Sequence, residues 1–459
     1  MYAVSNPTPK NVVLLVATMS SFLTPFMGSS INIALPSIGD EFSLSAVTLS
    51  WVATSYLLAA AMFLVPFGRI ADIHGRKLVF LLGMCVFTLA SLLSGFATSA
   101  TQLIVFRVIH GIGSAMIFGT AVAILMSVFP PGERGRVLGI SVAAVYLGLS
   151  LGPFLGGILT EHLTWRSVFF VNVPLGLIVI AFVLWKLRGE WAEARGERFD
   201  FVGSAIWGVA LALLMYGFSK LPGLPGAGLT LIGVAGIVVF AIWELRAESP
   251  VLDMRLFRDN RVFAFSNLAA LINYSATFAV TFLLSLYLQK VKGLSPQYAG
   301  TILVAQPVVM AFFSPFAGRL SDRIEPRLVA SLGMALTTLG LFFLIFVNDE
   351  TTLPTIVASL CILGLGFALF SSPNTNAVMS SVSRKFYGVA AGTVGTMRLT
   401  GQMLSMGVAT MVFAIYIGGL EIEPEIFPLF LISMRTALII FAAACFAGIF
   451  ASLARGKVR

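Results

Sequence analysis

Charged residues are scarce in this sequence. They make up 11% of its 459 residues, against roughly 25% in soluble domains, while 58% of the residues are hydrophobic. A chain of this composition cannot cover itself with a polar surface, which excludes a soluble globular protein. The apolar residues fall in repeated blocks of about twenty, the length that crosses a hydrocarbon core of about 30 Å. We therefore expect an all-α membrane protein with many transmembrane helices.

Cysteine and histidine are equally rare, with three of each. The cysteines stand inside apolar blocks, where a thiol is usually a small packing residue, so neither a disulfide framework nor a metal site is expected. The sequence has no His-Glu-x-x-His motif, paired intramembrane aspartates or bis-histidine haem site, so we expect no enzyme and no cofactor. It also lacks the Gly-x-x-x-x-Gly-Lys-Ser/Thr phosphate loop, so ATP is not expected to bind.

The connections between the apolar blocks are charged or rich in proline and glycine, and they divide the chain into about fourteen predicted spans. These spans lie near residues 11–38, 46–67, 78–98, 102–127, 137–160, 168–187, 202–219, 226–245, 262–289, 298–317, 328–347, 353–377, 388–417 and 433–454. The first block follows Lys10 but is too long for a secretory signal and lacks a convincing cleavage site. We therefore expect it to be an uncleaved first span.

The positive charge of the chain is unevenly distributed. An even number of spans places both termini on one side, and the connections on that side hold most of the 29 lysines and arginines. Basic residues gather on the cytoplasmic side of membrane proteins, so both termini are predicted to be cytoplasmic, in the inner or plasma membrane of a prokaryote. The net charge of +9 is thus explained by topology, and because the basic residues form no single stripe, nucleic acid is not an expected partner.

One loop pattern occurs twice. Residues 68–77 and 318–327 share the form Gly-Arg-x-x-Asp-x-x-x-x-Lys/Arg, after the second and the tenth predicted span. The two copies correspond only if each half has six spans and two extra spans lie between the halves. The expected organisation is a six-helix bundle at 1–190, a two-helix insert with its linkers at 191–261 and a second six-helix bundle at 262–459. The two bundles should be related by an axis along the membrane normal.

Three further patterns lie in the first half. They are Arg107–Gly113 (RVIHGIG), Gly148–Gly157 (GLSLGPFLGG) and Trp165–Gly176 (WRSVFFVNVPLG). With these motifs in this order, the chain resembles the major facilitator superfamily, and within it the fourteen-span drug:proton antiporters of the EmrB/QacA type. The resemblance covers nearly the whole chain. It implies a monomer that exports drugs or other small amphipathic molecules by alternating access, with protons as the coupling ion.

The repeated loops are candidate gates. Gly68 lets helix ends approach closely, and Asp72 can pair with Arg69 or Arg76. A charge cluster that forms only when the cytoplasmic helix ends meet would favour an outward-open state. In the second copy the corresponding residues are Gly318, Arg319 and Asp322. The alternative is that these charges only set the topology of short turns.

The fifth predicted span carries Gly148, Gly152 and Gly156 at every fourth position, which makes one smooth face for close helix packing. Pro153 removes a helical hydrogen bond and is expected to bend the span. A packing seam is the direct interpretation, and the resemblance adds an association of this stripe with export by exchange. These four residues are therefore further gating candidates.

Two charged residues, Arg107 and Arg398, lie inside predicted spans, where ionisable groups are costly and are functional candidates. His110 and Ser114 share a helical face with Arg107, and Gln402 follows Arg398 by one turn. Both helices should line a cavity with these polar stripes. The candidate pathway for substrate and protons is completed by Asn32, Asn273 and Tyr274. For each amide or hydroxyl taken singly, hydrogen bonding between helices is the favoured interpretation.

Acidic residues are missing from the middle of the membrane, because all 20 aspartates and glutamates fall in connections. Related antiporters commonly carry an acid five positions before the asparagine of the first span, and here that position is Met27. A buried carboxylate usually alternates between a proton and a cationic drug, so cationic-drug exchange is put in question. His110 is the remaining candidate for proton coupling, because imidazole titrates near neutral pH. The favoured alternative is a hydrogen-bonding replacement for the family's glutamine that does not titrate.

The two arginines leave the expected cavity net positive, so neutral or anionic substrates should be tolerated better than dications. A passive channel would instead need rings of like residues or filter repeats, and the sequence shows neither. Within transporters, the main alternative is an exporter or importer of an endogenous metabolite or lipid with the same fold.

Overall fold

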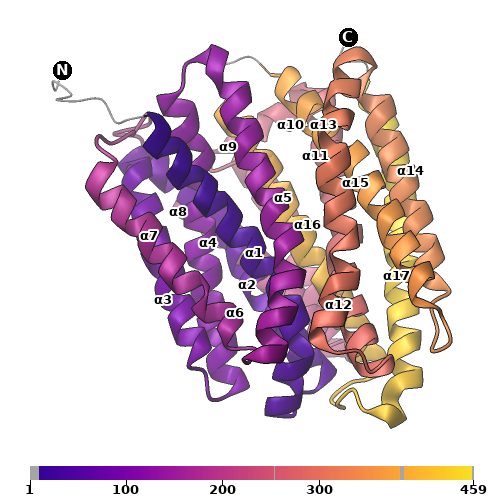
Figure 1. Ribbon diagram of the computed structural model, residues 1–459. Coiled ribbons are helices and arrows are strands. Elements are labelled where there is room, and N and C mark those ends of the chain that lie inside the picture. Colours follow the sequence, from indigo (N-terminus) through magenta and orange to yellow (C-terminus); the bar gives the residue numbers. More distant parts are fainter. Residues whose placement is uncertain (1–9, 253, 383–386, 457–459) are drawn as a thin grey trace.

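The computed structural model describes residues 10–252, 254–382 and 387–456. Within these ranges, fourteen helices are long and apolar enough to cross a membrane, which confirms the expected all-α membrane fold. Helix α1 (Lys10–Phe42) begins at the same end of the molecule at which α17 (Phe427–Ala454) finishes (Figure 1). We call this end the terminus side and the opposite end the far side.

The first seven helices pack on one another and form what we call the N-terminal bundle. They are α1, α2 (Ala46–His74), α3 (Arg76–Gly95), α4 (Ala100–Val128), α5 (Pro131–His162), α6 (Ser167–Phe170) and α7 (Asn172–Lys186). Helix α1 packs along α5, α4 packs against both α2 and α3, and α7 packs against α3. Ser45 and Ser99 begin α2 and α4, because each hydroxyl accepts a hydrogen bond from the backbone N–H three residues on.

A second group of helices forms the C-terminal bundle and repeats this packing. It contains α10 (Arg255–Asp259), α11 (Arg261–Leu286), the π-helical turn η1 (Tyr287–Val291), α12 (Pro296–Leu303), α13 (Ala305–Arg323), α14 (Pro326–Ile345), α15 (Leu353–Ser380), α16 (Tyr387–Tyr416), the 3-10 turn η3 (Pro424–Ile426) and α17. Helix α11 packs along α16, α15 packs against α13 and α14, and α17 packs against α14. Each pair corresponds to a pair in the N-terminal bundle, as expected for a duplicated unit.

Two more helices, α8 (Phe201–Ser219) and α9 (Leu224–Arg246), come between the bundles in the sequence and pack on each other. Helix α8 contacts α2 and α16, so it bridges the two bundles along one seam. The indole Nε1 of Trp207 donates to the carbonyl oxygen of Ala61, at 3.0 Å, and Gly407 lies close to Met215. Helix α9 is the most exposed of the fourteen spans, with 17% of its most apolar window buried, so lipid covers most of it.

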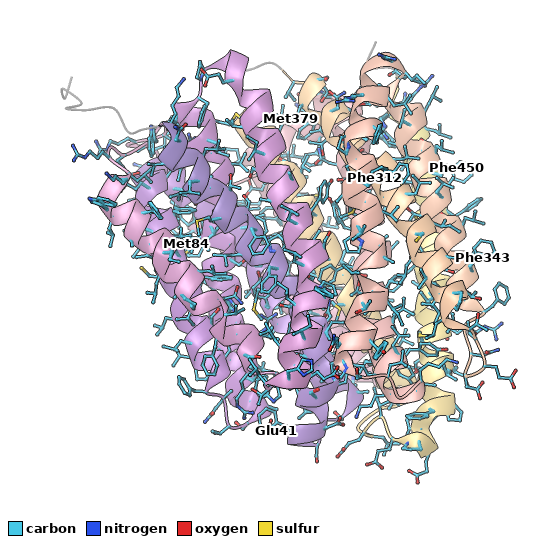
Figure 2. All side chains as sticks on the ribbon, viewed as in Figure 1. Glu41, Met84, Phe312, Phe343, Met379 and Phe450 are labelled. Atoms are coloured by element: carbon cyan, nitrogen blue, oxygen red, sulfur yellow. The ribbon has the colours of Figure 1, made fainter. Side chains whose placement is uncertain are left out.

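The surface of the helices is apolar where a soluble protein would be polar. Phe343 and Phe450 point away from the C-terminal bundle (Figure 2) and are 43% and 60% exposed. Backbone hydrogen bonds are satisfied inside each helix, which is the condition for crossing a hydrocarbon core.

The two bundles are joined mainly on the far side, where Figure 2 labels Glu41. Ser50 and Thr410 share a hydrogen bond of 2.9 Å, and the backbone N–H of Ala46 donates to the carbonyl oxygen of Leu420 at 3.1 Å. Lys290 forms an ion pair with Asp40. Further along the same side, Gln297 at the start of α12 binds both Glu161 and His162 at the end of α5. These contacts close the far side of the molecule.

Candidate functional site

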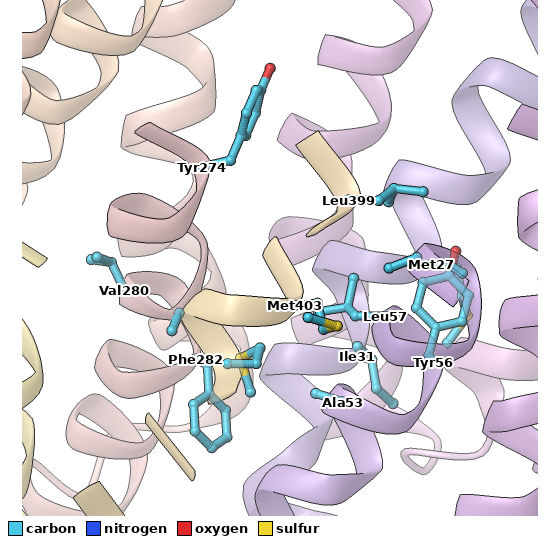
Figure 3. Packing of buried hydrophobic residues seen from close by; sticks show 14 of the residues in the cluster. Met27, Ile31, Ala53, Tyr56, Leu57, Tyr274, Val280, Phe282, Leu399 and Met403 are labelled. Atoms are coloured by element: carbon cyan, nitrogen blue, oxygen red, sulfur yellow. The ribbon is translucent and has the colours of Figure 1, made fainter. Parts of the chain in front are cut away.

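A central cavity lies between the two bundles. It consists of two adjoining pockets that share Gly28, Tyr56, Leu57 and Phe278. The rest of its wall is formed by Thr24, Pro25, Ile31, Asn32, Ala53, Arg107, Phe118, Leu149, Arg398, Leu399 and Gln402. Figure 3 shows Tyr56 and Leu57 of α2 close to Leu399 of α16. The wall is mostly apolar and aromatic, and its two charged residues come from different bundles.

Arg107 enters the cavity from α4 and is only 1% exposed. Its Nε donates to the carbonyl oxygen of Val52 at 3.1 Å, and its guanidinium carbon lies 4.3 Å from the centre of the Tyr56 ring. A carbonyl dipole and an aromatic face both favour a cation, and together they offset part of its desolvation. Among the described residues, no carboxylate forms an ion pair with Arg107. The positive charge of Arg107 is therefore not neutralised by a neighbouring carboxylate of the described chain.

His110 lies one turn after Arg107, behind the cavity wall. Its Nδ1 is 3.4 Å from a terminal nitrogen of Arg107, and its Nε2 is 3.2 Å from the hydroxyl of Ser91 on α3. The imidazole is fully buried, with the Phe87 ring 4.2 Å away between centres. Ser114, one further turn along, shares a 2.7 Å hydrogen bond with Tyr56. Of the polar stripe expected on this helix, only Arg107 reaches the cavity, and the other two face α2 and α3.

On the opposite wall, Arg398 and Gln402 of α16 both line the cavity. The guanidinium of Arg398 lies 5.7 Å from the centre of the Tyr274 ring, and that ring packs edge-on against Phe367. The Nε atom of Arg398 is buried and has no hydrogen-bond partner in the described part of the chain. The structure thus places Arg398 and Gln402 in the cavity wall, and the ring of Tyr274 lies next to Arg398 but outside the cavity lining.

The two candidate asparagines occupy different environments. Asn32 lines the cavity, and its carbonyl oxygen accepts a hydrogen bond from Ser285 of the other bundle at 2.6 Å. Its side-chain oxygen has no partner within the described ranges. Asn273 is fully buried inside the C-terminal bundle, away from the cavity lining, and neither of its amide atoms has a partner among the described residues. Of these two asparagines, only Asn32 lines the cavity.

Met27, at the position where related antiporters carry an acid, does not line the cavity. It is fully buried, and its sulfur accepts a hydrogen bond of 3.3 Å from the side chain of Asn172 on α7. The residues of α1 that line the cavity are instead Thr24, Pro25, Gly28, Ile31 and Asn32.

The glycine stripe of α5 packs directly on α1. A Cβ at Gly148 would lie 2.5 Å from the carbonyl oxygen of Phe22, and one at Gly152 would meet the side chain of Ser29. Gly156 lies against Ser30 in the same way. Beyond the stripe, the carbonyl of Pro153 faces Gly300 of α12, where a Cβ would be 2.2 Å from it. The far end of α5 is therefore held closely between both bundles.

The first loop, residues 68–77, is bound by the acidic linker, as we call residues 187–200 after α7. Arg76 donates to Asp72 at 2.8 Å and to Glu193 at 2.9 Å, and Arg69 pairs with Glu197. The carboxylate of Glu190 accepts hydrogen bonds from the first free N–H groups of α3, on Lys77 and Leu78, at 2.7 and 3.1 Å.

In this structure the acidic linker supplies most of the carboxylates of the charge cluster, which the sequence analysis did not anticipate. A signal for this was present in the sequence, since the linker holds three glutamates at 190, 193 and 197.

The second loop, residues 318–327, has other neighbours. Gly318 lies close to Ser372 of α15, and the side chain of Arg319 is exposed. The side chain of Asp322 lies outside the described part of the structure. In this loop the hydroxyl of Ser321 accepts a hydrogen bond from Asn376 at 3.1 Å.

Arg455 was not singled out from the sequence, because it falls in the basic segment after the last span. It is fully buried, and one terminal nitrogen donates to the side chains of Asn374 and Ser266, at 3.0 and 3.3 Å. These contacts tie α17 to α15 and α11 on the terminus side, so Arg455 is a structural residue of the C-terminal bundle.

Two similar helical bundles around a shared cavity, enclosed by apolar outer surfaces, define a membrane transporter and not an enzyme. Comparison with known families agrees, because the family model of the Major Facilitator Superfamily matches residues 17–405 and 266–457. The chain belongs to the major facilitator superfamily, as its motifs indicated.

The names of individual relatives refer to different transport functions. The multidrug resistance protein Stp of Mycobacterium tuberculosis is 30% identical over 422 residues, which cover 90% of this chain and 78% of Stp. The riboflavin transporter RibZ of Clostridioides difficile is 29% identical over 392 residues, 85% of each chain. Among solved structures, a bacterial homologue of the human lysosomal transporter Spinster, in an inward-facing and occupied conformation, has a TM-score of 0.67 at 18% identity. That match covers 98% of this chain and 97% of the other, and it shows the fold.

Proposed function

We propose that this protein is a secondary active transporter that exports small amphipathic molecules by alternating access, in exchange for protons. The observation that carries the proposal is the central cavity, which lies between the bundles and holds one arginine from each of them. Its walls are otherwise mainly apolar, which suits a hydrophobic substrate. Its two pockets enclose only about 10 and 30 Å³ of cavity volume, so the bundles have to move apart to admit one. The likeness to Stp, a multidrug resistance protein, supports export of drugs.

The distribution of basic residues indicates which side of the molecule faces the cytoplasm. We place the terminus side in the cytoplasm, because its connections hold most of the lysines and arginines. The contacts between the bundles would then close the outer side of the membrane. Transport requires that residues 1–190 and 262–459 move as two bodies about the cavity, so the far-side contacts break as the terminus side closes.

Proton coupling is assigned to His110, which lies next to Arg107. A proton taken up by the imidazole would place two positive charges 3.4 Å apart, and the repulsion would push Arg107 from its place beside Val52. Such a movement would change the cavity wall, which is how a proton can alter substrate affinity. The competing role is a fixed hydrogen-bonded chain from Ser91 through His110 to Arg107, which needs no titration.

Two groups of residues are proposed gates. On the terminus side, Arg69 and Arg76 exchange partners between the acidic linker and the approaching C-terminal bundle. On the far side, the tight contact of α5 with α12 is the seam that opens, while α5 and α1 move together. Both gates are built from close contacts with defined partners, so a change of state has to replace one set of contacts by another.

A carrier of an endogenous metabolite is the second candidate function, and the likeness to the riboflavin transporter RibZ favours it. The cavity wall suits either function, because an aromatic metabolite and a drug present similar surfaces to it.

Reconstitution into liposomes tests the proposal. We expect uptake of a substrate into inside-out proteoliposomes against its gradient when the lumen is acidified, and loss of uptake when a protonophore is added. Downhill movement alone, with no response to the proton gradient, would contradict coupling, and import driven in right-side-out vesicles would contradict export.

A further inference from the structure

We propose that Arg107 and Arg398 together bind the negatively charged group of the transported molecule, so that the substrates are small amphipathic anions such as aromatic carboxylates. The inference rests on the proposed transport function, and it adds the substrate class and the residues that recognise it. The two arginines belong to α4 and α16, so the anion would be held by both bundles at once.

Arg107 provides a fixed positive charge in a dry site. Its partners are the carbonyl of Val52, the Tyr56 ring and the neighbouring imidazole, none of which is an anion. A buried cation without a counter-ion attracts an anion strongly, because little water remains to screen the pair. Tyr56 lines both pockets, so the pocket that contains Arg107 adjoins the rest of the cavity.

Arg398 provides unused hydrogen-bond donors. In the described part of the chain it makes no ion pair, its Nε is buried without a partner, and its contact with Tyr274 is to the ring face. A guanidinium presents five donors in a planar fork that matches a carboxylate, and here most of that fork is available. Gln402, one turn along the same wall, adds an amide beside it.

The other residues of the cavity wall indicate the chemistry of the uncharged part of the substrate. Phe278, Phe118 and Leu149 offer an apolar and aromatic surface suited to a flat hydrophobic body. The side-chain oxygen of Asn32, buried and unpartnered among the described residues, can accept a hydrogen bond from a hydroxyl or N–H group of the ligand. The acidic residues of the described chain lie in the connections and at helix ends, so the cavity holds no carboxylate that would repel the anion.

Placing the two charges on different bundles has a mechanical consequence. If the bundles closed around the site without an anion, these two positive charges would come closer together, and their repulsion would oppose closure. An anion between them removes the repulsion and draws both walls together.

Equilibrium binding to the purified protein in nanodiscs tests the inference without requiring transport. The probes are radiolabelled 2-naphthoate and its neutral counterpart 2-naphthamide, which share one aromatic body. We expect the wild-type protein to bind 2-naphthoate at least about tenfold more tightly than 2-naphthamide, a difference typical of one charge-assisted hydrogen bond. In Arg398→Gln this preference should fall to within about twofold, and Arg398→Lys should restore part of it.

Arg435→Gln is the matched control, because it neutralises an exposed arginine of α17 outside the cavity. It should keep the wild-type preference. Arg107→Gln should lose the preference for 2-naphthoate as Arg398→Gln does. If the substitution of the buried Arg107 prevents folding, the result for the half-buried Arg398 still tests the anion site. Equal affinity for the two probes in the wild type, no saturable binding of 2-naphthoate, or an unchanged preference in Arg398→Gln would each overturn the anion site. Binding that follows the expected pattern in a protein that moves nothing in liposomes would overturn the transport proposal alone.

Discussion

At the scale of single residues, the cavity is organised by polar groups that lack their usual counter-charges. Arg107 is stabilised by a carbonyl and a ring, and His110 by a serine and a neighbouring guanidinium. Sequence alone identified both residues, because charge inside a span is rare enough to notice. The sequence could not predict which neighbour each side chain faces, because residues on this face of the helix can reach either the cavity or α3.

His110→Gln separates the two roles of this residue. Glutamine can keep a hydrogen bond to Ser91 but cannot take up a proton. If His110 carries the coupling proton, transport by the wild type should change several-fold as the pH is lowered below about 6, because a buried imidazole beside Arg107 takes up a proton only in acid, and the variant should change by less than about twofold. His74→Gln, on the terminus side, is the control and should keep the wild-type profile. A variant with an unchanged pH profile would leave His110 with only a hydrogen-bonding role.

At the scale of helices, α5 packs closely along α1 through its glycines. The spacing of Gly148, Gly152 and Gly156 predicted a packing seam, and the structure places that seam against Phe22, Ser29 and Ser30. The partner helix was not predictable, since a smooth face fits any neighbour.

Gly148→Ala should destabilise the N-terminal bundle. The added Cβ would lie 2.5 Å from the backbone oxygen of Phe22, and backbone cannot rotate away as a side chain can. We expect a loss of about 1–3 kcal/mol, seen as a lower melting temperature in detergent and a lower yield of folded protein. Gly228→Ala in α9 is the control, because nothing lies within 4 Å of its Cβ position. Equal melting temperatures for the two variants would show that the seam is looser than described.

The acidic linker makes contacts for which the sequence shows the charges but not the partners. Its glutamates read as ordinary loop charges, because their partners lie more than 100 residues earlier in the chain. In the structure, Glu190 caps α3, and Gly75 has a positive φ of 127° at the point where a Cβ would strike that carboxylate. A glycine is needed there for both reasons.

Glu190→Ala should loosen the start of α3. The amide groups of Lys77 and Leu78 lose their acceptors, and a missing cap costs about 1 kcal/mol, which corresponds to about fivefold faster hydrogen exchange at these amides. Glu248→Ala, an exposed glutamate of the following connection, should leave the exchange unchanged. Identical exchange in Glu190→Ala and the wild type would mean that the linker does not hold the loop in solution.

At the scale of the whole molecule, hydropathy and charge predicted the number and type of the spans, because lipid imposes one simple length rule. The ends were less certain: the fifth span was expected at 137–160 and occupies Pro131–His162, since Pro131 suits the first turn of a helix. Arg455 was assigned to a loop because hydropathy cannot tell a buried arginine from a solvated one. Which state the molecule adopts depends on contacts between distant segments, and no local pattern encodes that.

The central claim is that the two bundles must separate on the far side for transport to occur. Ser50→Cys/Thr410→Cys tests it, in a background with Cys85, Cys361 and Cys445 replaced by alanine, because the two hydroxyls are 2.9 Å apart across the interface. The control pair Ser21→Cys/Ser141→Cys has a similar separation of 2.8 Å but lies within the N-terminal bundle. Oxidation should stop transport by the first protein and reduction should restore it, whereas the control should transport in both conditions. Full transport by the protein cross-linked between residues 50 and 410 would contradict alternating access at this interface.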